Sequence, residues 1–122
     1  MDSITGCICA DEQCSMVACD ISAIGYERTD SVVRHVDLCQ CRLCGSSWLK
    51  FRLEDESSPG WNRWYRGFID AEEATELDFA TALEFLAGLP WHFYGGAYYR
   101  STGERSSGPV PDSALWISAD AA

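Results

Sequence analysis

Seven cysteines within the first 44 residues give this 122-residue sequence its clearest chemical pattern. The motif Cys41-x-x-Cys44-Gly45 separates two thiols by two residues, a spacing that lets one tight turn present both sulfur atoms to a single tetrahedral metal ion. The glycine that follows permits the backbone twist that such a turn requires. Because a structural zinc ion has four ligands, two more must come from the remaining cysteines.

Cys7 and Cys9 are the predicted second half of this zinc site, because a Cys-x-Cys pair is compact and does not readily close on itself as a disulfide. An odd number of cysteines in a chain without a recognisable export signal also favours metal binding over a disulfide framework. The alternative ligands for these two places are Cys14 first, and then Cys19, Cys39 and His35.

The sequence offers little support for catalysis. A thioredoxin-like role for Cys41 and Cys44 would need the motif to open a helix, whereas here it joins two predicted antiparallel strands. A cysteine hydrolase would need a base and an orienting group beside the thiol, and nothing ties His35 or His92 to a particular cysteine. We expect His92 to be partly buried and hydrogen-bonded to the backbone. The sequence therefore predicts a protein that is not an enzyme.

Alternating apolar and polar side chains predict antiparallel strands joined by short loops. The predicted strands cover residues 32–39, 48–53, 61–69 and 91–94, with a possible short strand at 115–117. Residues 102–111 have the Gly, Ser and Pro content of a loop.

One amphipathic helix is predicted between the third and fourth strands. Its apolar residues have the spacing of a single helical face and are Phe79, Ala82, Leu83 and Leu86. Either Asp70 with Glu73 or Thr75 with Asp78 supplies its cap, and Gly88 with Pro90 ends it.

These elements predict an α+β fold. It comprises an antiparallel sheet of about four strands, one packed helix and a cysteine-rich N-terminal segment stapled by the zinc knuckle. We expect residues 1–122 to form a single domain with five parts. The parts are a cysteine-rich segment (1–30), a β-meander with the CxCxxCG motif (31–69), the helix (70–89), a C-terminal strand and loop (90–117) and a frayed end (118–122).

The chain is strongly acidic, with 9 Lys and Arg against 19 Asp and Glu and a formal net charge of −10 at pH 7. This charge opposes binding to nucleic acid and favours a basic protein partner. We expect no contact with a membrane either, since no run of 18 apolar residues occurs. Two acidic clusters, residues 54–56 and 70–78, suit an interface when aromatic side chains lie beside them. The predicted partner-binding residues are Glu54, Asp55, Glu56, Trp61 and Trp64.

The order of these features resembles small zinc-binding immunity proteins of bacterial polymorphic toxin systems. Those proteins pair an N-terminal Cys-x-Cys with a later CxxCG and a Trp, as in Cys7-Ile8-Cys9 and the run from Cys41 to Trp48 here. They also carry an acidic turn, an aromatic strand and a Tyr-Gly-Gly segment, matched by residues 54–56, 61–67 and 91–98. The likeness is a spaced pattern over most of residues 7–108.

This resemblance implies a cytoplasmic, non-catalytic protein with a structural zinc ion that binds and occludes a cognate toxin. The acidic charge suggests that the toxin is basic. Two other classes of protein remain as alternatives. One is a phage-type acidic inhibitor that mimics nucleic acid and blocks a defence nuclease, and the other is a zinc-ribbon-like adaptor.

Overall fold

The structure, a computed structural model, describes residues 19–111 and 115 of the chain. Its main element is a six-stranded antiparallel sheet in which every strand pairs with the next along the chain. The strands are β1 (Cys19–Thr29), β2 (Val32–Cys41), β3 (Ser47–Asp55), β4 (Arg63–Ile69), β5 (Trp91–Gly96) and β6 (Ser101–Ser107). No helix in the described part of the chain is long and apolar enough to cross a membrane.

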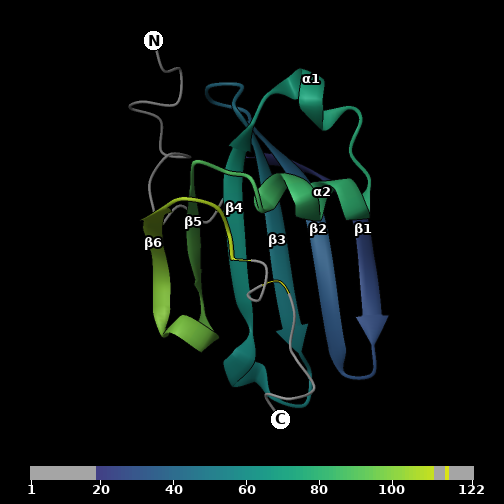
Figure 1. The fold of residues 1–122 in the computed structure, drawn as a ribbon, viewed down its shortest axis with the longest axis vertical. Helices are drawn as coiled ribbons and strands as arrows, with labels where there is room; N and C mark the ends of the chain where they lie inside the picture. Colours follow the sequence, from purple (N-terminus) through teal and green to yellow (C-terminus); the bar gives the residue numbers. More distant parts are fainter. Residues whose placement is uncertain (1–18, 112–114, 116–122) are drawn as a thin grey trace.

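Two helices connect β4 to β5, and they lie differently on the sheet. The four-residue helix α1 (Ala71–Ala74) lies at one end of the sheet, and α2 (Phe79–Leu86) crosses one face (Figure 1). Two short 3-10 turns, η2 (Pro59–Trp61) and η3 (Ala97–Tyr99), lie at the opposite end from α1. The molecule therefore has a second layer where α2 crosses the sheet, and a short helix at one end of the strands.

Strand alternation places the main core beneath α2. Leu49, Phe51 and Leu53 on β3 are completely buried in one cluster with Ala82 and Leu86 of α2. Because successive side chains of a strand point to opposite faces, the intervening residues of β3 lie on the face away from the helix.

A capping box begins α2 and explains where this helix starts. The Asp78 carboxylate accepts a hydrogen bond from the Thr81 amide at 2.9 Å, and the Thr81 hydroxyl accepts one from the Asp78 amide at 2.8 Å. This arrangement satisfies amide donors that the first helical turn leaves open. The predicted helical part, residues 70–89, is thus divided into α1 and α2 by the cap at Asp78.

A second core lies on the face opposite α2. This aromatic–cysteine cluster consists of five buried residues, Cys19, Cys39, Cys41, Trp48 and Phe93. The buried guanidinium of Arg66 lies 4.6 Å from the ring centre of Trp48 and 4.3 Å from that of Phe93. Both faces of the sheet therefore carry buried apolar side chains.

The prediction of an α+β fold with about four strands is wrong: the structure is mostly β, with six strands and one helix longer than a single turn. The N-terminal part shows one reason. Residues 19–29 were assigned to a cysteine-rich segment held by a zinc knuckle, but they form β1 and pair with β2 through the backbone. A bulge between Ala23 and Gly25 shifts the register, and most side chains of this edge strand are exposed. The apolar alternation that marks a half-buried strand is consequently weak here. The zinc knuckle is not part of the described fold.

The sixth strand was also missed, for a similar reason. The sequence predicts a loop over residues 102–111, yet residues 101–107 form β6, which pairs with β5 and places Ser107 opposite Trp91. β6 is the other edge of the sheet, and its Ser, Thr and Gly content resembles that of a loop. Backbone hydrogen bonds to β5 define this strand without an apolar pattern.

Candidate functional site

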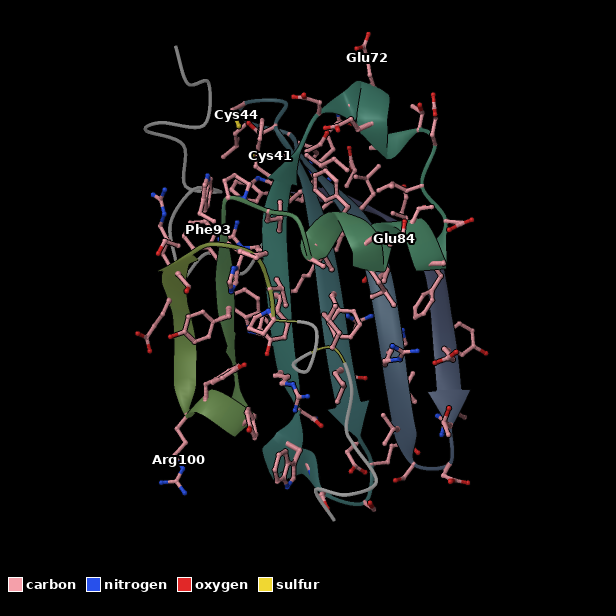
Figure 2. All side chains as sticks on the ribbon, viewed as in Figure 1. Cys41, Cys44, Glu72, Glu84, Phe93 and Arg100 are labelled. Carbon is pink, nitrogen blue, oxygen red and sulfur yellow. The ribbon has the colours of Figure 1, made fainter. Side chains whose placement is uncertain are left out.

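The turn between β2 and β3 brings Cys41 and Cys44 to the same end of the sheet as α1 (Figure 2). The Gly45 amide donates to the Cys41 carbonyl at 2.8 Å, and the Cys41 amide donates to the Ser46 carbonyl at 2.8 Å. Gly45 has a φ of +80°, a left-handed conformation that glycine adopts without steric cost. The motif therefore folds into the closed turn that its sequence predicts.

The two cysteines of this turn differ in burial. Cys41 is buried and Cys44 is half-buried, and the Cys44 thiol donates a hydrogen bond to the Ser46 hydroxyl at 3.1 Å. A hydroxyl group both donates and accepts, so Ser46 would donate to the sulfur once a metal displaced the thiol proton. The turn thus places a hydroxyl group beside one of the two thiols that the sequence predicts as ligands.

The rest of the predicted zinc site cannot be traced in the described residues. Cys7, Cys9 and the alternative Cys14 lie outside them. Within residues 19–111 and 115, no group of three or more Cys, His, Asp or Glu side chains is arranged to hold a metal. Cys19 is nevertheless the register partner of Cys41, which places the two Cα atoms about 4.5–5.5 Å apart. The structure therefore makes Cys19 a stronger alternative ligand than the sequence suggests.

Two other alternative ligands are less well placed. Burial raises the pKa of the Cys39 thiol, and this residue packs beside Trp48 in the aromatic–cysteine cluster. His35 lies on the same strand as Cys41 but six residues away, a separation of about 20 Å along a strand. Its Nε2 atom lies 3.5 Å from a Glu54 carboxylate oxygen, and its ring stacks on Tyr26. His35 and Cys41 are therefore too far apart to share one ion.

The acidic loop predicted to bind a partner makes extensive contacts within the chain. The Asp55 carboxylate is only 8% exposed and accepts hydrogen bonds from the Ser57 amide at 3.0 Å and the Ser31 hydroxyl at 2.8 Å. Hydrogen bonds from Ser57 and Ser31 hold the pKa of Asp55 below its ordinary value. Asp55 consequently stabilises the loop, and it offers little surface to another protein.

Its neighbours Glu54 and Glu56 are paired with basic groups. The two carboxylate oxygens of Glu56 accept hydrogen bonds from Arg28, each at 3.0 Å, and this pairing lowers the pKa of Glu56. The Glu54 carboxylate lies 3.5 Å from both Arg52 and His35. The negative charge of the loop is therefore largely balanced at close range.

The two predicted aromatic contacts differ in accessibility. Trp61 is 38% exposed on η2 and stacks on Tyr98 of η3, with ring centres 4.7 Å apart. Trp64 is half-buried on the face away from α2, where the Lys50 ammonium lies 5.2 Å from its ring centre. A Cβ atom on Gly95 would come within 2.8 Å of the Trp64 ring. Trp61 is therefore the better candidate for contact with a partner.

The second acidic cluster has a different character from the loop. Residues 70–90 contain six carboxylates and no Lys or Arg, namely Asp70, Glu72, Glu73, Glu76, Asp78 and Glu84. All six residues are exposed, and none forms an ion pair with a residue that the structure describes. Figure 2 shows Glu72 projecting from α1 away from the sheet. The helical connection is thus the most negative continuous surface element of the described chain.

His92 lies among tyrosines on the α2 side of β4 and β5. It is only 3% exposed, and its Nδ1 atom lies 2.9 Å from the Gly108 carbonyl, as expected for a buried histidine bonded to the backbone. Burial lowers the pKa of His92, so the ring is neutral at neutral pH. The hydroxyl groups of Tyr65 and Tyr99 are hydrogen-bonded to each other nearby. No local sequence pattern indicates this grouping, because its members come from β4, β5 and η3.

Comparison with known proteins returned no match: no protein-family model, no curated protein and no solved structure is similar to this chain.

Proposed function

We propose that this chain is an immunity-type inhibitor that binds a basic toxin protein in the cytoplasm and blocks it by occlusion, without catalysing a reaction. The observation that carries the proposal is the uneven distribution of charge over the domain. The six carboxylates of residues 70–90 lie on the helical layer, where no basic residue accompanies them.

The opposite face of the sheet carries more basic groups than the helical layer does. Five of the nine basic residues have register positions on this face, and they are Arg28, Lys50, Arg52, Arg66 and Arg105. Arg28 and Arg52 are paired there with Glu56, Asp37 and Glu54, and Arg66 is buried, so this face is largely balanced. The negative charge of the helical layer has no such balance within that layer, and a charge distribution of this kind gives the domain an oriented electric field. Such a field would direct the helical layer, and not the opposite face, towards a basic partner.

This charge distribution supports the α1–α2 surface as the region that attracts the partner, in preference to the acidic loop. An ion pair within the chain, such as that of Glu56 with Arg28, must be broken before its carboxylate can serve a partner fully. Glu72, Glu73 and Glu76 carry no such cost, and they are exposed. Trp61 remains a proposed aromatic contact at the other end of the sheet.

We also propose that Cys41 and Cys44 hold a structural zinc ion together with Cys7 and Cys9. The closed turn and the Ser46 hydroxyl beside the Cys44 sulfur support the first two ligands. A zinc ion bound only by thiolates has no open coordination position, so it would contribute to folding and not to a reaction.

Co-expression with the protein encoded by the adjacent gene tests the inhibitor proposal, with cell survival and complex recovery as readouts. The double variant Glu72→Lys/Glu73→Lys should slow association about tenfold at low salt, and the difference should shrink at high salt. The matched variant Glu56→Lys/Glu104→Lys changes the net charge equally but should slow association less. Full protection without a recoverable complex would overturn occlusion. A larger effect of the second variant would place the contact at the acidic loop.

A further inference from the structure

A cavity of about 290 Å³ lies on the α2 side of the sheet, over the strands β4, β5 and β6. Its lining includes Tyr65, His92, Tyr94, Tyr99, Ser106 and Pro109. The volume is near the lower limit of small-molecule pockets, which is about 300 Å³. The size therefore suits a ligand of one or two rings.

The hydrogen bond of His92 determines what this residue can offer to a ligand. Its Nδ1 atom lies 2.9 Å from the Gly108 carbonyl oxygen, which can only accept, so Nδ1 must carry the proton. In a neutral ring the other nitrogen, Nε2, is then an acceptor. No residue that the structure describes donates a hydrogen bond to Nε2. His92 therefore brings an unused acceptor to the cavity wall.

The two bonded tyrosines supply the complementary group. Tyr65 and Tyr99 share one hydrogen bond, and this bond uses only one of their two hydroxyl protons. Tyr65 is almost fully buried, whereas Tyr99 is half-buried. Burial and the bond to Tyr99 raise the pKa of Tyr65. If Tyr99 were the donor, the proton of the buried Tyr65 would have no acceptor among the described residues, so Tyr65 is the donor. The remaining proton is then that of Tyr99, which lines the cavity.

The other lining groups are neutral and largely apolar. The ring centres of Tyr94 and Tyr99 are 4.8 Å apart in an edge-to-face arrangement, and that of His92 lies 6.0 Å from that of Tyr94. Among the residues that the structure describes, no charged side chain lines the cavity. Aromatic walls favour a flat aromatic ligand, and the absence of a counter-charge disfavours an ionised one.

We propose that this cavity binds a small neutral phenol, whose hydroxyl group donates to His92 Nε2 and accepts from the Tyr99 hydroxyl. A phenolic hydroxyl is both a donor and an acceptor, so one atom of the ligand satisfies both groups. The aromatic ring of the ligand packs against the tyrosine and proline side chains. A free phenolic molecule and an exposed tyrosine side chain share this chemistry.

Titration of the full chain with p-cresol, followed by amide NMR shifts, tests the proposal. We expect a Kd on the order of 1 mM, with shifts centred on residues 65, 92 and 99. The matched probe 4-methylanisole has the same ring but cannot donate, and it should bind about tenfold more weakly. Tighter binding of 2-naphthol than of N-acetyltyrosinamide would indicate a free small molecule, and the reverse order would indicate a tyrosine side chain.

Substitutions then separate the polar contacts from the shape of the cavity. His92→Asn keeps a donor for the Gly108 carbonyl but removes the Nε2 acceptor. The variant should therefore bind p-cresol and 4-methylanisole about equally. Tyr99→Phe should weaken p-cresol binding severalfold, whereas Tyr98→Phe, on the exposed ring stacked with Trp61, should not. Equal binding of the two probes to the parent protein, or equal effects of the two tyrosine variants, would overturn the proposal.

Discussion

Arg28 holds Glu56 in a bidentate ion pair, in which each terminal guanidinium nitrogen donates to one carboxylate oxygen at 3.0 Å. The pair joins the end of β1 to the loop after β3. The two residues are 28 positions apart in the sequence, and β2 lies between their strands in the sheet. Both side chains are exposed, so the attraction acts across water-accessible space and is screened by salt. An acidic residue that seemed available to a partner is thus already engaged.

Glu56→Gln should lower the unfolding midpoint slightly at low salt, because the charge opposite Arg28 is lost. The difference should vanish at molar salt. The pairing lowers the pKa of Glu56, so its stabilisation is present above the ordinary glutamate pKa and is lost as the pH falls below about 4. Thermal unfolding at two salt concentrations and several pH values measures both effects. Glu72→Gln is the control, and an equal loss there would show that the ion pair contributes nothing.

How far the sequence predicts this fold depends on where each strand lies in the sheet. β2 and β3 are internal strands with one face beneath α2, so apolar residues such as Val36 and Phe51 recur at every second position. The edge strands β1 and β6 pair on one side only, and their polar, glycine-containing sequences carry little such signal. A prediction that relies on apolar alternation therefore recovers the centre of the sheet and misses its edges.

The candidate site divides in a similar way between local and distant contacts. The turn at Cys41 and Cys44 follows from four neighbouring residues, and its shape agrees with the sequence. The burial of Asp55 depends on Ser31, which is 24 residues away, and no local pattern reveals it. The juxtaposition of Cys19 with Cys41 likewise depends on strand register. Contacts between residues that are distant in the sequence therefore could not be predicted from local patterns.

Cys41→Ser and Cys44→Ser should each lose bound zinc and lower the free energy of unfolding by several kcal/mol, because metal binding stabilises the folded state directly. Metal analysis of the purified protein, combined with denaturant unfolding, measures both quantities. Cys39→Ala is the control, since this thiol is buried beside Trp48; it should keep the metal and cost about 1 kcal/mol. A parent protein that contains no metal would contradict the zinc proposal.

Trp61→Ala should leave the fold intact and mainly speed dissociation of the complex with the partner. The ring is 38% exposed, and loss of its stacking on Tyr98 should cost about 1 kcal/mol of stability. Trp64→Ala should destabilise more, about 2–3 kcal/mol, because this ring is half-buried against Gly95. Surface plasmon resonance measures the dissociation rate of the complex, and denaturant unfolding measures the stability of each variant. An unchanged dissociation rate in the Trp61 variant would remove this residue from the interface.

His92→Asn should flatten the pH dependence of stability between pH 7 and 5. Burial lowers the pKa of His92 in the folded protein, so the unfolded chain binds a proton more readily below its ordinary pKa of about 6.5. The parent protein should therefore lose stability as the pH falls through this range. The asparagine amide can still donate to the Gly108 carbonyl without titrating. Parallel pH profiles for the two proteins would show that protonation of His92 does not oppose folding.

Gly96→Ala should destabilise the end of the sheet that carries η2 and η3. Gly96 has a φ of +120°, and a Cβ atom there would lie 2.7 Å from Arg63 Cα and 2.8 Å from the Asn62 carbonyl oxygen. Both neighbours are backbone atoms of the adjacent segment, so the strand must shift, and we expect a loss of about 2 kcal/mol or more.

Gly60→Ala provides the matched control for this substitution. Gly60 has open space around the position of its Cβ atom, and alanine restricts the unfolded chain more than glycine, so stability should stay the same or rise by up to about 1 kcal/mol. Denaturant unfolding gives the two free energies, and tryptophan fluorescence reports on the Trp61–Tyr98 stack beside the altered backbone. Equal stability of the two variants would contradict the close approach of β5 to the chain at Asn62 and Arg63.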